Sequence, residues 1–160
     1  MKKDESEDKL FFDKMYLETF KTTLMDRDKL TEEEIVQKYR EFDENNPLDI
    51  YMPEHCIFIA EDNEKNKVGL IWLMNRQPFW RFKERLIWIY NLHVIPDFRG
   101  QGLARKLLKK AEEWADRQGL DTIALHVYEN NKTARQLYES LDYTHIETDN
   151  ESCIYEKKLN

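Results

Sequence analysis

The sequence has little glycine, proline or cysteine and no long apolar run. Glycine and proline occur four times each and cysteine twice in 160 residues. Such low glycine and proline contents exclude collagen-like and low-complexity chains. Cys56 and Cys153 lie too far apart for a zinc site and are too few for a disulfide framework. No stretch approaches the 18 apolar residues of a membrane span, so none is predicted.

What remains is typical of a globular protein in a reducing compartment. Hydrophobic residues make up 41% of the chain, which is enough for a packed core, and its length favours a single domain over residues 1–160. The first ten residues, MKKDESEDKL, lack the apolar segment of a secretory signal. Both cysteines lie in apolar runs, so we expect buried free thiols and a cytoplasmic location.

Negative charge is concentrated in the first part of the chain. The formal net charge is −7, and residues 1–64 hold 9 Lys and Arg against 19 Asp and Glu. An acidic chain is a poor partner for nucleic acid, and nothing in the sequence indicates a membrane partner. The acidic residues are either a solvated surface or a rim that attracts a cationic substrate.

Hydrophobic periodicity predicts an α/β (α+β) fold with a mixed sheet. Helical spacing covers 8–25 and 31–45, and the second helix opens with Thr31 and Glu34 in the spacing of a capping box. The runs at 55–61 and 68–75 indicate a hairpin, and a third strand is expected at 86–95. A long helix from 103 to a C-terminal Gly119, a strand at 122–129, a helix at 131–141 and two final strands complete the order.

Two of the four glycines lie where the third strand meets the long helix. The segment reads VIPDFRGQGLA and places Arg99, Gly100 and Gly102 before the first helical turn. The first N–H groups of a helix have no intrahelical partners and carry the positive end of the helix dipole. Glycine lets a bulky anion approach them, so the segment suits a pyrophosphate. The alternative is a turn that needs glycine for its geometry alone.

The same segment resembles the acyl-CoA-binding motif of the GNAT superfamily of N-acetyltransferases. Arg99, Gly102 and Ala104 fill that motif. The later segment ENNKTARQLYESL resembles a second family segment, whose positions are filled by Asn131, Ala134 and Tyr138. The resemblance covers about residues 55–159, with the acyl-CoA-binding core at about 86–141.

The resemblance implies a GNAT-like fold and a set of site residues. The fold is a mixed central sheet with helices on both faces, in which strands 86–95 and 122–129 splay apart around the pantetheine arm. Tyr138 would protonate the departing thiolate, and Asn131 would bind the cofactor arm. Backbone groups would hold the rest of the cofactor, at Leu92, His93 and Val94 for pantetheine and at Arg99, Gly100, Gln101, Gly102, Leu103 and Ala104 for the pyrophosphate.

The implied activity is transfer of acetyl from acetyl-CoA to a primary amine. The amine belongs to a small cationic molecule or a protein lysine, and it attacks the thioester directly through a tetrahedral intermediate without a metal. Homodimers are common in the family, so a homodimer is an open possibility here. Two alternatives remain: a module that senses acyl-CoA without turnover, and a structural domain that binds no CoA.

The sequence departs from the family pattern where a general base is usual. Many members carry a carboxylate on the cofactor strand, and this chain has Tyr90 and Asn91 there. Neither side chain is a base at neutral pH. His93, Glu129 or a chain of waters could take the proton instead, whereas His126 is expected to be packed or exposed rather than catalytic. The family's usual first strand is also missing, because no strand-like run precedes residue 8.

Overall fold

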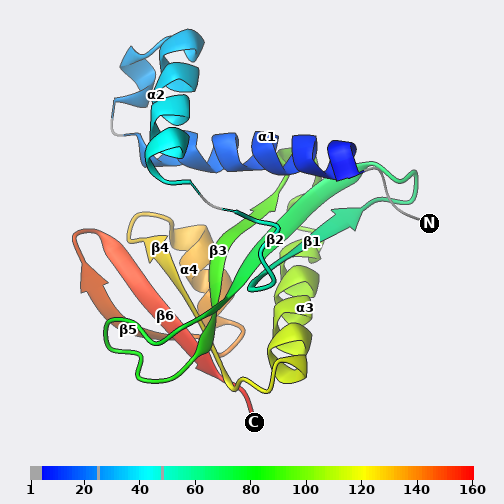
Figure 1. The fold of residues 1–160 in the computed structure, drawn as a ribbon, viewed down its shortest axis with the longest axis vertical. Helices are drawn as coiled ribbons and strands as arrows, with labels where there is room; N and C mark the ends of the chain where they lie inside the picture. The colour runs from blue at the N-terminus through cyan, green and yellow to red at the C-terminus, as the bar shows by residue number, and fades with distance from the viewer. Residues whose placement is uncertain (1–4, 25, 48) are drawn as a thin grey trace. The chain divides into compact units, whose positions relative to one another are not determined.

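The chain folds into two compact units. The computed structural model describes residues 5–24, 26–47 and 49–160 (Figure 1). One unit spans Met1–Met52 and the other Pro53–Asn160, and each is described by itself. The single domain expected over 1–160 stays a prediction. Among the described residues, no helix is long and apolar enough to cross a membrane.

The first unit is a pair of helices. α1 (Glu5–Thr23) and α2 (Glu32–Asn45) are joined by a turn that includes the short helix η1 (Arg27–Lys29). The predicted capping box is confirmed, because Thr31 Oγ1 accepts from the Glu34 N–H at 3.2 Å and Glu34 accepts from the Thr31 N–H at 2.7 Å. Aromatic rings pack between the two helices. The ring centroid of Phe20 lies 5.5 Å from that of Tyr39 and 5.2 Å from that of Phe42. Residues 1–4 lie outside the described chain, so the question of a strand before residue 8 stays open.

The second unit is built on a six-stranded mixed sheet, as the sequence predicts. Its strand order is β1-β2-β3-β4-β6-β5, and β3 and β4 are parallel while the other neighbours are antiparallel. The strands are β1 (His55–Glu61), β2 (Lys67–Arg76), β3 (Leu86–Val94), β4 (Thr122–Tyr128), β5 (Thr144–Asp149) and β6 (Ser152–Lys158).

Two helices of this unit pack on one face of the sheet. α3 (Leu103–Arg117) and α4 (Lys132–Glu139) contribute to a single core cluster with β2, β3, β4 and β6. The apolar stripe of α3 is buried there, and its members are Leu107, Leu108, Ala111, Trp114 and Ala115. α3 ends as predicted, because Gly119 has φ +69° and the Leu120 N–H donates to Ala115 O.

The two cysteines are free thiols. Cys153 is buried, whereas Cys56 is only half-buried, so the expectation of burial is wrong in part for Cys56. The surrounding protein still raises the pKa of the Cys56 thiol by desolvation. The Cys56 thiol is therefore not set up as a nucleophile.

Candidate active site

The parallel strands β3 and β4 pair only at one end. Their register joins Ile87 to Ile123, Trp88 to Ala124 and Ile89 to Leu125, and no later pair follows within residues 49–160. Beyond that point β3 stays paired with β2 as far as Val94, and β4 stays paired with β6 as far as Tyr128. The two strands therefore splay, which confirms the predicted gap.

A β-bulge lies where the splay begins. Leu73 of β2 pairs with Ile89 and the adjacent Trp72 pairs with Asn91, which leaves Tyr90 as an extra residue in β3. A bulge bends its strand and increases the local twist. The extra residue therefore accounts for the turn of β3 away from β4. Tyr90 itself stacks on Trp72, with ring centroids 4.6 Å apart.

The backbone of β3 beyond the bulge borders the gap. The Ile95 N–H donates to Val68 O at 2.9 Å, so the polar groups of Ile95 face β2. Successive residues of a strand point their backbone groups to opposite sides. Those of Leu92 and Val94 therefore face the gap, and those of His93 face β2. The family resemblance assigns the backbone of Leu92, His93 and Val94 to pantetheine. In the structure, only Leu92 and Val94 of these three direct their backbone polar groups into the gap.

Gly69 of β2 lets β3 approach closely. It pairs with Val94, and a Cβ atom added at Gly69 would lie 2.9 Å from the carbonyl oxygen of His93. Any side chain there would displace the segment that borders the gap. The sequence carried a signal for this role, since a lone glycine inside a strand pattern indicates close backbone approach.

The N-terminus of α3 is open to an anion. Gly102 is its N-cap with φ +80° and provides no side-chain cap, and Gly100 also has a positive φ of +74°. A Cβ atom at either glycine would meet no other protein atom within 4 Å. The space beside these backbone N–H groups is therefore free for a ligand.

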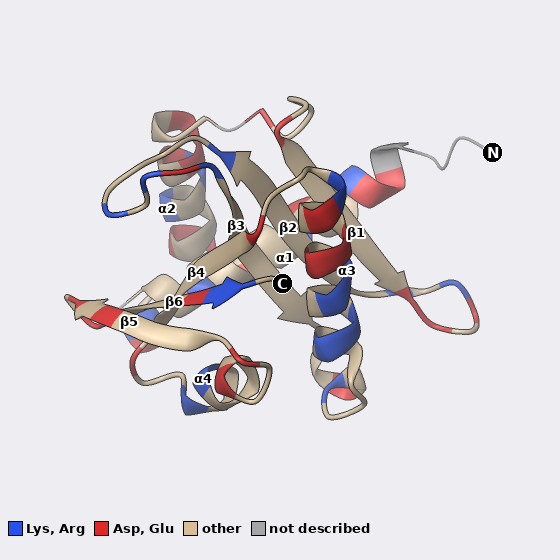
Figure 2. Cartoon of the chain, turned by 90° about the horizontal axis from the view of Figure 1, so that it is seen from below, with Lys and Arg blue, Asp and Glu red and all other residues tan. Residues whose placement is uncertain are grey.

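The charges of α3 run against its own dipole. α2 places three glutamates in its first turn, as a helix N-terminus favours, whereas α3 has no acidic residue there. Arg105, Lys106, Lys109 and Lys110 occupy its first half instead, and Glu112, Glu113 and Asp116 follow (Figure 2). Such an arrangement costs helix stability and favours a bound anion.

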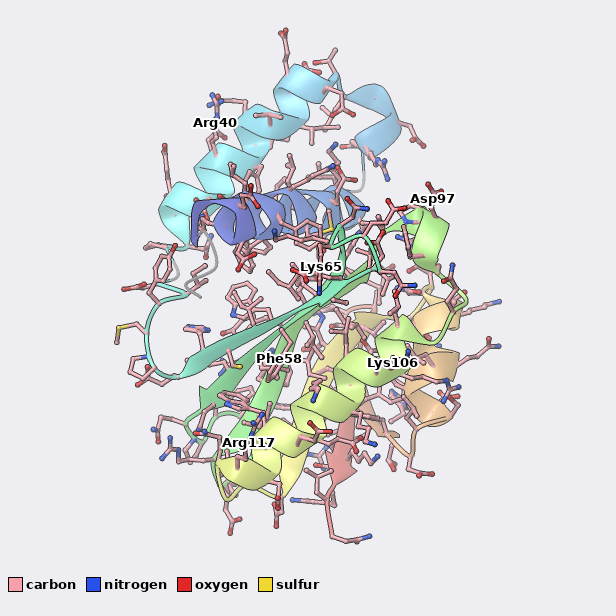
Figure 3. All side chains as sticks on the ribbon, turned by 90° about the vertical axis from the view of Figure 1, so that its right-hand side faces the viewer. Arg40, Phe58, Lys65, Asp97, Lys106 and Arg117 are labelled. Carbon is pink, nitrogen blue, oxygen red and sulfur yellow. The ribbon has the colours of Figure 1, made fainter. Side chains whose placement is uncertain are left out.

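Arg99 fastens the glycine-rich loop to β3. Its Nε atom donates to the carbonyl oxygen of Val94 at 2.8 Å, and Gln101 donates to Asp97 O at 3.4 Å. The short helix η2 (Pro96–Phe98) and the start of α3 flank this loop, as the labelled Asp97 and Lys106 show (Figure 3). The sequence predicts a backbone contact of Arg99 with the pyrophosphate but not this side-chain bond, because the bond depends on the direction of the Val94 carbonyl.

Tyr138 and Asn131 lie on α4. Tyr138 is buried in the core cluster that contains Leu125 and Val127, and its ring lies 5.7 Å from that of Tyr143. Burial raises the pKa of the Tyr138 hydroxyl, so it stays protonated at neutral pH. Asn131 is the N-cap of α4, accepting from the Ala134 N–H at 3.2 Å.

Known proteins resemble the chain in sequence and in fold. The model of the acetyltransferase (GNAT) family matches residues 15–143. The uncharacterized N-acetyltransferase YycN of Bacillus subtilis is 31% identical over 71% of this chain and 67% of its own length. The spermidine N(1)-acetyltransferase of Vibrio cholerae is 30% identical over 67% of this chain and 61% of its own length.

A solved structure agrees in fold over most of the chain. The PaiA N-acetyltransferase of Thermoplasma acidophilum, solved in complex with coenzyme A, has a TM-score of 0.63 and 20% sequence identity. The match covers 91% of this chain and 89% of that one. The family match, the two sequence relatives and the splayed sheet agree, and the chain is therefore an acetyltransferase of the GNAT family.

Proposed function

We propose that the protein transfers acetyl from acetyl-CoA to a primary amine of a small cationic molecule or of a protein lysine. One observation carries the proposal: an uncapped helix N-terminus with two open glycines lies at the end of a strand that has splayed from its neighbour. Acetyl-CoA offers a pyrophosphate for the first feature and an extended amide-bearing arm for the second. Bound acetyl-CoA supplies the activated acetyl group.

The backbone of the splayed strand and of the glycine-rich loop would hold the cofactor. The N–H groups from Arg99 to Ala104 would bind the pyrophosphate, helped by the positive end of the α3 dipole. Leu92 and Val94 would pair with the pantetheine amides, as an added strand does. Asn131 would bind the same arm beside its capping bond.

Two groups would act on the reacting atoms. The Leu92 N–H faces the gap and would donate a hydrogen bond to the thioester carbonyl oxygen, where negative charge develops during attack. Tyr138 would donate its hydroxyl proton to the thiolate sulfur as the C–S bond breaks. Its raised pKa keeps the hydroxyl protonated at neutral pH, so the proton is present when the thiolate departs.

A cationic amine is the acceptor that the charges favour. The chain is acidic overall, and one relative is named for acetylation of spermidine, a polyamine. The loop 77–82 carries aromatic side chains of the kind that bind cations, as the guanidinium of Arg76 does at 3.5 Å from the ring centroid of Phe79. Trp80 of the same loop is exposed and could offer a further face.

A thiol-release assay with acetyl-CoA and a panel of amines tests the proposal. The panel should contain polyamines, lysine peptides and amino acids of matched size. We expect turnover with the cationic amines, and turnover only with carboxylate-bearing amines would contradict the choice of acceptor. Calorimetry that shows tight CoA binding with no thiol release across the panel would instead favour the sensor alternative, which the missing carboxylate at Tyr90 and Asn91 motivates.

A further inference from the structure

His126 lies on β4 at the point where the gap opens. The last β3–β4 pair is Ile89 with Leu125, and His126 is the next residue of β4. Leu125 and Val127 belong to the core cluster beneath α3. Because side chains alternate along a strand, the imidazole of His126 points to the opposite face of the sheet. An amine that enters the gap from that face meets this ring.

The ring is held in a fixed place. It stacks on Trp88, with centroids 6.3 Å apart and an interplanar angle of 25°. Tyr128 meets it edge-on at 6.1 Å. The Nδ1 atom lies 3.2 Å from Ser152 Oγ. In the tautomer in which Nδ1–H donates to this hydroxyl oxygen, Nε2 carries no hydrogen and is the nitrogen that can accept a proton.

We propose that Nε2 of His126 accepts the proton that the substrate ammonium must lose before it attacks the thioester. This inference rests on the proposed function, since it assigns a residue to that reaction. It supplies the base that is absent from Tyr90 and Asn91 on β3, and it places that base on the neighbouring strand.

The proton balance is complete with two side chains. The ammonium gives one proton to His126, and the neutral amine then forms the N–C bond to give the tetrahedral intermediate, whose collapse breaks the C–S bond. Tyr138 protonates the sulfur and is reprotonated by the second proton that the nitrogen loses. His126 returns its proton to solvent, so each turnover yields an amide, a thiol and one free proton.

The position of His93 makes it a weaker candidate. His93 lies beyond Leu92 along β3, beside the stretch assigned to the pantetheine arm, whereas His126 lies where the strands begin to part. The acyl end of an arm that enters from the α3 N-terminus lies deepest in the gap, at the His126 end. Glu129 lies past the end of β4 and is exposed.

The neighbours of the ring set its protonation. Desolvation lowers the pKa of His126 below 6.5, so the imidazole is neutral at pH 7 and ready to accept a proton. Strand register places Ser152, Ile154 and Glu156 of β6 and Glu147 and Asp149 of β5 on the same face. Tyr90 of β3 and Tyr128 of β4 also lie on this face, as does Arg76 of β2, whose guanidinium lies 5.6 Å from the ring centroid of Trp88. Glu147 is paired with Arg81 at 3.4 Å, which reduces its effect on His126.

The test is the pH profile of kcat/KM with a polyamine, for the wild type and for His126→Gln. In the wild type we expect a plateau at neutral pH and a fall in rate below a midpoint under 6.5. In His126→Gln this fall in rate at low pH, the acid limb of the profile, should lose its midpoint. The rate should then rise about tenfold per pH unit towards the pKa of the free amine, because only unprotonated amine can attack. At pH 7 we expect a loss of about 100-fold, with CoA affinity unchanged.

Three further measurements decide between outcomes. His126→Glu should restore activity and move the acid limb to lower pH, since a carboxylate titrates below an imidazole. His145→Gln, a change on β5 on the other face of the sheet, should keep the wild-type profile. If the His126 variants fail to fold, the NMR titration of His126 in the wild type must coincide with the kinetic limb.

Three results would overturn the inference while leaving the acetyltransferase activity in place. They are a wild-type acid limb in His126→Gln, loss of the acid limb in His93→Gln, and an NMR midpoint of His126 far from the kinetic midpoint. A wild-type protein that releases no thiol with any amine would instead overturn the proposed function, and the role of His126 with it.

Discussion

The side chain of Arg99 donates a hydrogen bond of 2.8 Å from Nε to the main-chain carbonyl oxygen of Val94. The bond ties the start of the glycine-rich loop to the last residue of β3. The backbone that borders the gap and the N–H groups at the start of α3 are therefore held in a fixed relation. A ligand that spans both is met by a preformed site, which lowers the cost of ordering on binding.

Replacing Arg99 should weaken CoA binding more than loss of one positive charge would. Arg99→Gln removes the charge and the Nε bond, and Arg99→Lys keeps the charge but not the planar fork. We expect both to raise the Kd for CoA by about 10-fold, close to 1.4 kcal/mol. Isothermal calorimetry gives the values. Arg117→Gln, at the other end of α3, is the control for charge, and an equal loss there would contradict a positional role for Arg99.

Alanine substitutions at two glycines with similar positive φ should differ in their effect on the affinity for CoA. Gly102 and Gly119 have φ of +80° and +69°, and a Cβ at either would meet open space. Alanine at each position should destabilise the fold by about 1 kcal/mol, because L residues disfavour this region. Only Gly102→Ala should also weaken CoA binding, since its Cβ would enter the space beside the N–H groups at the N-terminus of α3, where the pyrophosphate is proposed to bind. Thermal unfolding measures the loss of stability in both variants, and calorimetry measures the affinity for CoA. An equal loss of affinity in the two variants would argue against this binding site.

Removing the hydroxyl of Tyr138 should slow the reaction without weakening CoA binding. We expect Tyr138→Phe to lower kcat by about 100-fold, as loss of a general acid does. The raised pKa of Tyr138 means that its proton is lost only above the ordinary tyrosine range, so the wild type should show no loss of activity from this group up to pH 10.

Tyr143→Phe is the matched control for Tyr138→Phe. The Tyr143 hydroxyl is buried and has no hydrogen-bond partner among residues 5–24, 26–47 and 49–160. Removing such a group is expected to be neutral or to stabilise by up to about 1 kcal/mol. Equal loss of kcat in both variants would show that packing of the tyrosines, and not proton donation, limits the rate.

The capping box of α2 should make the helical unit sensitive to acid. Hydrogen bonds from the Thr31 N–H and hydroxyl lower the pKa of Glu34 below its ordinary 4.5. A lowered pKa gives stability that is present above about pH 4.5 and is lost as the pH falls through the folded-state value. Thr31→Ala should cost about 1 kcal/mol at neutral pH and less in acid.

Circular dichroism at several pH values measures the effect of Thr31→Ala. Thr22→Ala is the control, because its hydroxyl bonds only to Thr19 O within α1. A loss in Thr31→Ala that is the same at pH 7 and at pH 3 would mean that the bond from the Thr31 hydroxyl to the Glu34 carboxylate contributes nothing to stability.

Local patterns were sufficient to predict most elements of the fold. The capping box at Thr31 and the end of α3 at Gly119 are each determined by a few adjacent residues, and both are confirmed. The open N-terminus of α3 could also be read from the sequence, because Gly100, Gly102 and the absence of an early acidic residue are adjacent in the chain.

The finer features of the site depend on register, which a single sequence does not reveal. Tyr90 is a bulge residue only because of how β3 pairs with β2, and that pairing sends Leu92 and Val94 to the gap. His126 alternates with apolar neighbours in the sequence, which suggested a packed or exposed side chain with no role. Its place at the end of the β3–β4 pairing becomes visible only when the strands are assembled.

The most direct test of the proposed pyrophosphate site at the N-terminus of α3 is an NMR titration of the uniformly nitrogen-15-labelled protein with acetyl-CoA. We expect saturable shifts of the amide signals from Arg99 to Ala104 and of Leu92 and Val94, with smaller shifts at His93, whose N–H faces β2. Absence of binding at millimolar acetyl-CoA, or shifts that leave the Gly100 and Gly102 amides unmoved, would contradict the assignment of this site.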